Sequence, residues 1–193
     1  NLTFGREDVV SPIVVLPIFE EETIDAYEVG LKTDLADGRV RLNGAAFFYT
    51  YDNLQYQATD PEVFQGGVGN IPESEIMGAE LELGAFLTDS LIFDARLAWL
   101  DTEITSSHLA LDNVESEAAT NALLAQGISL FSPDVEIARA AQIADVEGNE
   151  LAKTPSFTAN LALTYSSPIG SWGNFEGSLS YTHRGDFRHR IFN

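Results

Sequence analysis

The sequence predicts an all-β fold of about six long antiparallel strands, and three observations carry this prediction. Six segments alternate apolar and polar residues with period two, as strands with two different faces must. The connections between these segments are alternately short and long. In the middle of each segment, the charged side chains occupy almost only one of the two faces.

In chain order, the predicted strands are residues 27–34, 40–51, 79–85, 91–99, 157–165 and 175–182. The first two are separated by Asp37-Gly38, a dipeptide that suits a tight hairpin turn. Short connections also follow at residues 88–90 and 167–174, whereas residues 53–74 and 105–153 are expected to form long loops. About 20 residues without a strand pattern precede the first strand.

The longest loop contains two segments that favour helix. Residues 115–125 are rich in alanine and leucine, and Ser132-Pro133-Asp134 has the composition of a helix start, with proline at the first helical position. Two helical turns are expected over residues 135–143. We interpret these short helices as elements that pack the loop on itself.

The distribution of charge favours a membrane barrel over a water-soluble one. A soluble barrel hides its apolar residues inside, whereas a membrane barrel presents them to lipid and keeps its polar residues in a wet lumen. The charges predicted to face the lumen are Glu28, Lys32, Asp34, Arg41, Glu80, Glu82, Asp94, Arg96 and Glu176. The opposite face has aromatic residues near the strand ends, where membrane barrels have aromatic girdles.

The turns also predict the strand register. If Ala36 and Arg39 flank the first turn, Asp34 lies opposite Arg41. The second turn places Glu82 opposite Arg96 in the same way. We expect these pairs to hold register on the polar face.

Six strands are too few to close a membrane barrel, for which about eight is the smallest known number. The chain starts at Asn1 rather than methionine and has no signal-peptide pattern. We therefore expect residues 1–193 to be part of one barrel domain, with the other strands outside this sequence.

Composition excludes several functions. The chain has 30 acidic and 10 basic residues, a net charge of −20, which argues against nucleic acid as a partner. Without cysteine there is no disulfide, thiolate metal site or cysteine nucleophile. The three histidines, His108, His183 and His189, have no spacing to a nucleophile, so an outer-membrane phospholipase or protease is not favoured. We expect no enzyme activity, no cofactor and no resident metal.

A series of motifs resembles the TonB-dependent outer-membrane receptors. Residues 27–32 (YEVGLK) resemble a strand motif of that family, and 47–53 (FFYTYDN) are similar to the corner that ends its next strand. Residues 78–83 (GAELEL), 97–103 (LAWLDTE) and 148–155 (GNELAKTP) are similar to further motifs, in the family's order. The resemblance covers nearly the whole chain, from about residue 22 to 187.

The resemblance implies a 22-stranded barrel plugged by an N-terminal domain in the bacterial outer membrane. Such receptors import scarce ligands with energy passed on by TonB, most commonly ferric siderophores, and also haem, cobalamin or sugars. The implied partners are membrane lipid and lipopolysaccharide, the plug domain, TonB and a small-molecule ligand such as a metal chelate. The plug and the TonB-binding segment are missing from this sequence.

Aromatic and basic residues near the upper strand ends are candidates for contact with an anionic iron chelate, by stacking and charge. These candidates are Tyr49, Tyr51, Gln55, Arg184 and Arg188. For the two tyrosines, anchoring at the membrane interface is the competing interpretation. The alternative function is a soluble or surface all-β binding module, such as a sandwich, without transport activity.

Overall fold

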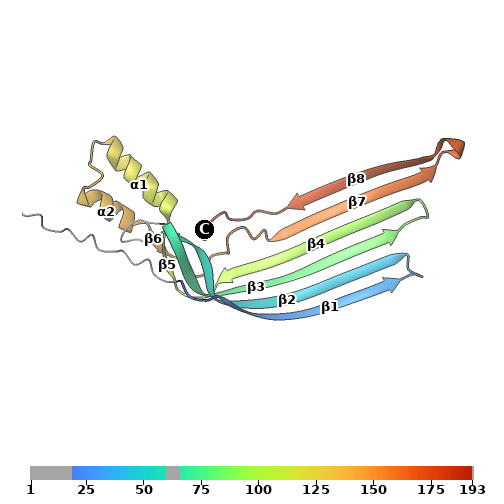
Figure 1. The fold of residues 1–193 in the computed structure, drawn as a ribbon, viewed down its shortest axis with the longest axis horizontal. Helices are drawn as coiled ribbons and strands as arrows, with labels where there is room; N and C mark the ends of the chain where they lie inside the picture. Colours follow the sequence, from blue (N-terminus) through green and yellow to red (C-terminus); the bar gives the residue numbers. More distant parts are fainter. Residues whose placement is uncertain (1–18, 60–65, 193) are drawn as a thin grey trace, which may run out of the picture.

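The computed structural model describes residues 19–59 and 66–192 and consists mainly of long strands. In chain order the elements are β1 (Thr23–Leu35), β2 (Val40–Thr59), β3 (Gly66–Phe86), β4 (Leu91–Ile104), β5 (Leu109–Leu111), α1 (Asn113–Ala125), α2 (Pro133–Ala140), β6 (Ile143–Asp145), β7 (Phe157–Pro168), the 3₁₀ helix η1 (Gly170–Trp172) and β8 (Asn174–Arg184). The long strands lie side by side, and α1 and α2 gather at one end of them (Figure 1).

The six predicted strands form one open antiparallel sheet in the order β1-β2-β3-β4-β7-β8. β5 and β6 pair separately as a small hairpin. A sandwich would need a second sheet stacked on the large one, and none covers it among the described residues. The sheet is therefore an unclosed segment of a barrel wall.

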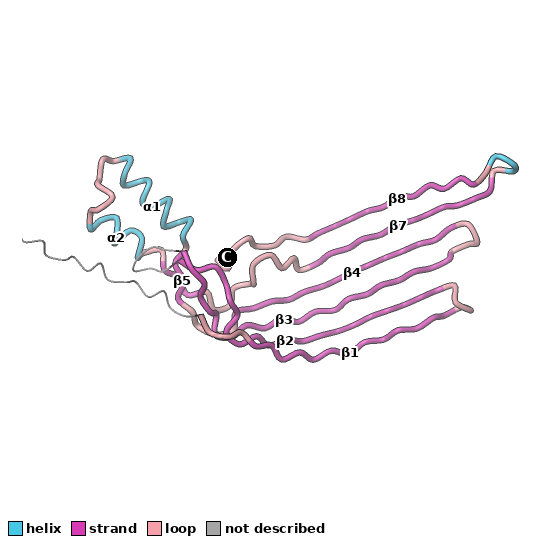
Figure 2. Tube along the Cα trace, in the orientation of Figure 1, coloured by secondary structure: helices cyan, strands magenta, loops and turns pink. Residues whose placement is uncertain are grey.

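All three short turns lie at one end of the sheet, and the long connections lie at the other (Figure 2). In the first turn, Ala36, Asp37 and Gly38 have φ values of 52°, 54° and 83°, and the Arg39 amide donates to the Ala36 carbonyl at 3.1 Å. Arg39 also pairs with Asp89 of the neighbouring turn at 2.8 Å. The predicted turn at Asp37-Gly38 is confirmed.

The expected loop over residues 53–74 is shorter than predicted. β2 continues to Thr59 and β3 begins at Gly66, and their pairing runs on from Leu54–Ile71 to Thr59–Gly66. The backbone bends where Asn53, at φ 56°, faces Pro72. A proline lacks the amide hydrogen that the ladder needs, so pairing is interrupted there and resumes above.

The two faces of the sheet differ as the alternation predicted. Apolar side chains on one face are exposed in mid-strand, for example Val29 at 72%, Leu31 at 58% and Leu179 at 73%. In register with them across β2, β3 and β4 are residues such as Ala46, Leu81 and Leu97, without charge. A face this apolar and this exposed is suited to lipid.

Both predicted helices are present, but α2 ends at Ala140 rather than at residue 143, where β6 begins. The Asp112 carboxylate caps α1 by accepting from the amides of Val114 and Glu115, and the Ser132 hydroxyl caps α2. The two helices pack together, and the Nε of Arg139 donates to the Thr120 hydroxyl at 2.8 Å. The prediction of a loop packed on itself by short helices is confirmed. Neither helix is long and apolar enough to cross a membrane.

Candidate functional site

The polar face of the sheet has ordered ion pairs. Arg41 donates to Asp34 at 2.9 Å, and Arg96 lies 3.7 Å from Glu82, which also accepts from Asn43. The register is the one predicted from the turns. All nine predicted lumen charges lie on this face of the strands: Glu28, Lys32, Asp34, Arg41, Glu80, Glu82, Asp94, Arg96 and Glu176.

Tyr49 and Tyr51 lie on the same face, near the end of β2 that leads to the long connections. The Tyr49 ring stacks on Phe47 with ring centres 4.9 Å apart. Phe47 in turn lies over Gly78, the residue opposite it on β3. Both tyrosines are half-buried.

Arg184 shares this face but lies four strands away. Its register row runs through Thr158, Ala98 and Glu80 to Ala45, so it is four residues below Tyr49 in the ladder. Four strand spacings of about 4.8 Å separate the two strands by roughly 19 Å. The guanidinium of Arg184 lies over the Phe187 ring, 5.2 Å from its centre.

The remaining two candidates, Gln55 and Arg188, form hydrogen bonds with neighbouring segments of the chain. The side-chain amide of Gln55 donates to the Glu20 carbonyl at 3.2 Å, and its backbone amide donates to the Glu22 carboxylate. The Arg188 carbonyl accepts from the Lys153 amide. The structure thus places Tyr49 and Tyr51 on one face of β2, with Gln55 further along the same strand, and puts Arg184 four strands away.

At the end of the strands that leads to the long connections, strand ends and loops pack around a small apolar core. Ile71, Ile104 and Val146 are fully buried there, and Leu54 and Ile191 pack with them. These residues come from the upper parts of β2, β3 and β4, from the β6 loop and from the segment after β8. Figure 1 shows the upper ends of β2 and β3 bending towards these loops. Strand ends and loops therefore form one packed body.

A polar cluster fastens the upper part of β2 to the β5–β6 hairpin. The Tyr56 hydroxyl and Nε2 of His108 are hydrogen-bonded at 2.8 Å. The Asp145 carboxylate accepts from the His108 amide at 2.9 Å and from the Ser107 hydroxyl at 2.6 Å. Burial raises the pKa of Tyr56. Burial also lowers the pKa of His108, although the negative charge of Asp145 acts to raise it. The hydrogen bonds that Asp145 accepts lower the pKa of its own carboxyl group.

A second polar contact joins the start of α1 to the segment after β8. Arg190 pairs with Asp112, whose side chain is only 11% exposed. The same carboxylate caps α1, so it serves two partners. The guanidinium also lies over Phe192, 5.7 Å from the ring centre.

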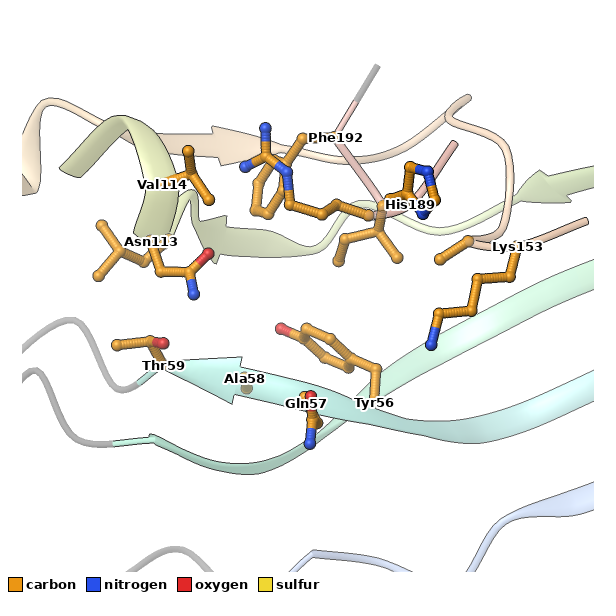
Figure 3. A pocket seen from close by; sticks show the side chains of 13 residues that line it. Tyr56, Gln57, Ala58, Thr59, Asn113, Val114, Lys153, His189 and Phe192 are labelled. Atoms are coloured by element: carbon orange, nitrogen blue, oxygen red, sulfur yellow. The ribbon is translucent and has the colours of Figure 1, made fainter. Parts of the chain in front are cut away.

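Between these two contacts lies a cavity of about 460 Å³ (Figure 3). Its walls come from the end of β2, the start of α1, residues 152–153 and residues 189–192. The side chains of Tyr56, Lys153, His189 and Phe192 line it. Among the residues that the structure describes, no cluster of histidine and carboxylate side chains is arranged to hold a metal ion.

Sequence reasoning assigned no ligand-binding role to the residues that line the cavity. Lys153 is part of the 148–155 motif, but the motif does not reveal that this residue has a φ of 64°. Tyr56 lies 52 positions from its partner His108, and Asp112 lies 78 positions from Arg190. Contacts over such separations leave no local pattern in a sequence.

The comparisons with known proteins agree with this architecture. Residues 6–190 match the family described as TonB dependent receptor-like, beta-barrel. A probable TonB-dependent siderophore receptor of Acinetobacter baumannii, PiuA, is 30% identical over 90 residues. That alignment covers 47% of this chain and 11% of the relative's length. Because the family match extends over nearly all of the sequence, the chain belongs to the TonB-dependent receptor β-barrel family.

Proposed function

We propose that this chain is part of the barrel wall of a bacterial outer-membrane receptor that imports a scarce small molecule with energy from TonB, and that the imported molecule is a ferric siderophore. The observation that carries the proposal is the contrast between the two faces of a single sheet. One face is apolar and exposed, as lipid requires, and the other has charges and ion pairs suited to a water-filled lumen.

The siderophore part of the proposal is supported by the name of the relative PiuA, a probable siderophore receptor. In this proposal the polar face lines the lumen, and a plug domain of the same chain occupies that lumen. The apolar face contacts lipid and lipopolysaccharide. Tyr49, Tyr51 and Arg184 contact the chelate, with Gln55 and Arg188 as further contacts.

Uptake by the full-length protein tests this function. The complete gene would be expressed in a bacterium that lacks its own siderophore receptors, in strains with and without TonB. Uptake of radioactive iron would be measured with catecholate, hydroxamate and citrate chelates. Uptake of radioactively labelled cobalamin, which contains no iron, would be the comparison. We expect uptake of at least one iron chelate that disappears without TonB. Equal uptake in both strains, or none from any chelate, would contradict the proposal.

Alanine substitutions test the contact residues. Tyr49→Ala, Tyr51→Ala and Arg184→Ala should weaken binding of the imported chelate to the full-length receptor. Tyr27→Ala is the matched control, because Tyr27 lies on the opposite, exposed face of the sheet. Unchanged affinity in the first three variants would remove those residues from the site.

A further inference from the structure

We propose that the cavity between the end of β2, the start of α1 and residues 189–192 binds an anionic, ring-bearing iron chelate through Lys153 and His189. The inference rests on the proposed function, because it assumes that the receptor binds a metal chelate. It adds a site separate from the Tyr49 and Tyr51 region and names the residues that bind the negative charge of the ligand there.

The first argument is the charge of the lining. Acidic residues outnumber basic ones 30 to 10 in the chain. Yet the 13 residues that line the cavity include Lys153, His189 and Arg190, and none is a carboxylate. A cavity whose charge is opposite to that of the whole chain attracts anions that the rest of the surface repels.

The second argument is the balance of charges around the cavity. Arg190 is paired with Asp112, so this arginine and the neighbouring carboxylate neutralise each other. Within residues 19–59 and 66–192, the Lys153 side chain forms no ion pair. The positive charge of Lys153 is therefore not neutralised by a neighbouring carboxylate among the described residues, and it can pair with an anionic ligand.

The third argument is the backbone at Lys153. Its φ of 64° lies in the left-handed region, which non-glycine residues rarely adopt. The Lys153 amide donates to the Arg188 carbonyl at 2.6 Å, which ties it to the segment that contains His189. A strained conformation of this kind persists only where the surroundings impose it; outside turns such as Ala36-Asp37 and the bend at Asn53, it clusters at active sites and ligand clamps.

The fourth argument is size and ring chemistry. A volume of about 460 Å³ is within the range of small-molecule sites, roughly 300–1,000 Å³. Tyr56 and Phe192 provide aromatic surface, and Figure 3 shows both rings together with Lys153 and His189 around the cavity. Rings of a catecholate can pack on this surface while their negative oxygens accept hydrogen bonds from Lys153 and His189.

The test compares two synthetic iron complexes on the full-length receptor in detergent. One is the anionic ferric complex of 2,3-dihydroxybenzoate, and the other is the neutral ferric complex of acetohydroxamate. Lys153→Asn removes the charge and keeps the fold, because asparagine tolerates the left-handed backbone. Lys153→Arg keeps the charge, and Lys32→Asn makes the same change far away on β1.

We expect Lys153→Asn to weaken binding of the dihydroxybenzoate complex about tenfold or more, the effect of losing one charge-assisted hydrogen bond. Lys153→Arg should stay close to the unchanged protein, and Lys32→Asn should have no effect. Binding of the neutral complex should be the same in all variants.

Unchanged affinity of Lys153→Asn for the anionic complex would overturn the site. An equal loss for both complexes would also overturn it, because the substitution would then act through structure rather than charge. If the receptor still imports iron chelates in either case, the proposed function stands and only the site fails. If the unchanged receptor binds neither complex and imports no chelate, both proposals fail.

Discussion

Replacing Leu81 with arginine should destabilise the folded receptor by about 2–4 kcal/mol, the cost of a lipid-facing charge near the middle of a bilayer. Leu81 lies on the exposed apolar face of β3, midway along the stretch from Met77 to Ala85, whose outward-facing residues are all uncharged. That stretch has about nine residues, enough for a tilted strand to cross the hydrocarbon. Its register partners Gly44 and Leu97 have no charge that an arginine could pair with.

The neighbouring residue provides the matched control. Glu80 points to the opposite, polar face, where its register partners are Ala45 and Ala98. Glu80→Arg should therefore change stability by less than about 0.5 kcal/mol, as for other exposed positions. Met77→Arg lies near the carboxylate of Glu75 at the upper end of the apolar stretch, where an arginine costs only about 0–1 kcal/mol.

The measurement is guanidinium unfolding of the full-length receptor in phosphatidylcholine vesicles, followed by tryptophan fluorescence. The expected order of stability is unchanged protein and Glu80→Arg together, then Met77→Arg, then Leu81→Arg. If Glu80→Arg and Leu81→Arg cost the same, the assignment of one face to lipid and the other to water would be refuted.

Three further perturbations have defined outcomes. A β-carbon added at Gly78 would lie 2.5 Å from the Phe47 ring, so Gly78→Ala should lower stability by about 1–3 kcal/mol in the same unfolding assay, and Phe47→Ala should restore part of it. Asp112→Asn keeps an oxygen that can cap α1 but removes the ion pair with Arg190, so limited proteolysis should cut residues 113–140 faster, whereas equal rates would show that the pair contributes nothing. Because burial lowers the pKa of His108, the folded loop binds fewer protons than the unfolded one; its stability is full above the ordinary histidine pKa of about 6.5 and falls as the pH drops below it. Hydrogen exchange of residues 105–112, corrected for its intrinsic pH dependence, should rise below that pH, and His108→Phe should flatten the rise.

Much of the sheet was predictable because its information is local. Period two and the turn at Asp37-Gly38 together determine which residues face each other, so the sequence alone predicts the pairing of Asp34 with Arg41 that the structure has. The start of α2 was predictable for the same reason, since the Ser132 cap acts within one turn of helix, whereas the Asp112 cap of α1 was not predicted.

The candidate site was predictable only in part. The sequence places Tyr49 and Tyr51 on one face of one strand, two residues apart, and the structure has them there. It does not reveal the cavity, whose walls are four segments far apart in the chain. Nor does it reveal the left-handed conformation of Lys153, which depends on the contact with Arg188 from a later segment.

The bend opposite Pro72 explains why, above the membrane, the alternation of apolar and polar residues no longer shows which side chains are exposed and which are buried. By the alternation of β2 and β3, Leu54 and Ile71 belong to the outward, apolar face of the sheet. Beyond the bend, however, they pack against Ile104, which by the alternation of β4 belongs to the polar face. In lipid, an outward apolar side chain is at no disadvantage, so period two reports the face directly. In water the same side chain is driven to bury itself, and the left-handed Asn53 provides the bend that lets it turn inward. The sequence pattern is thus unchanged across the bend while its physical meaning reverses, because the solvent on the outer side changes from lipid to water.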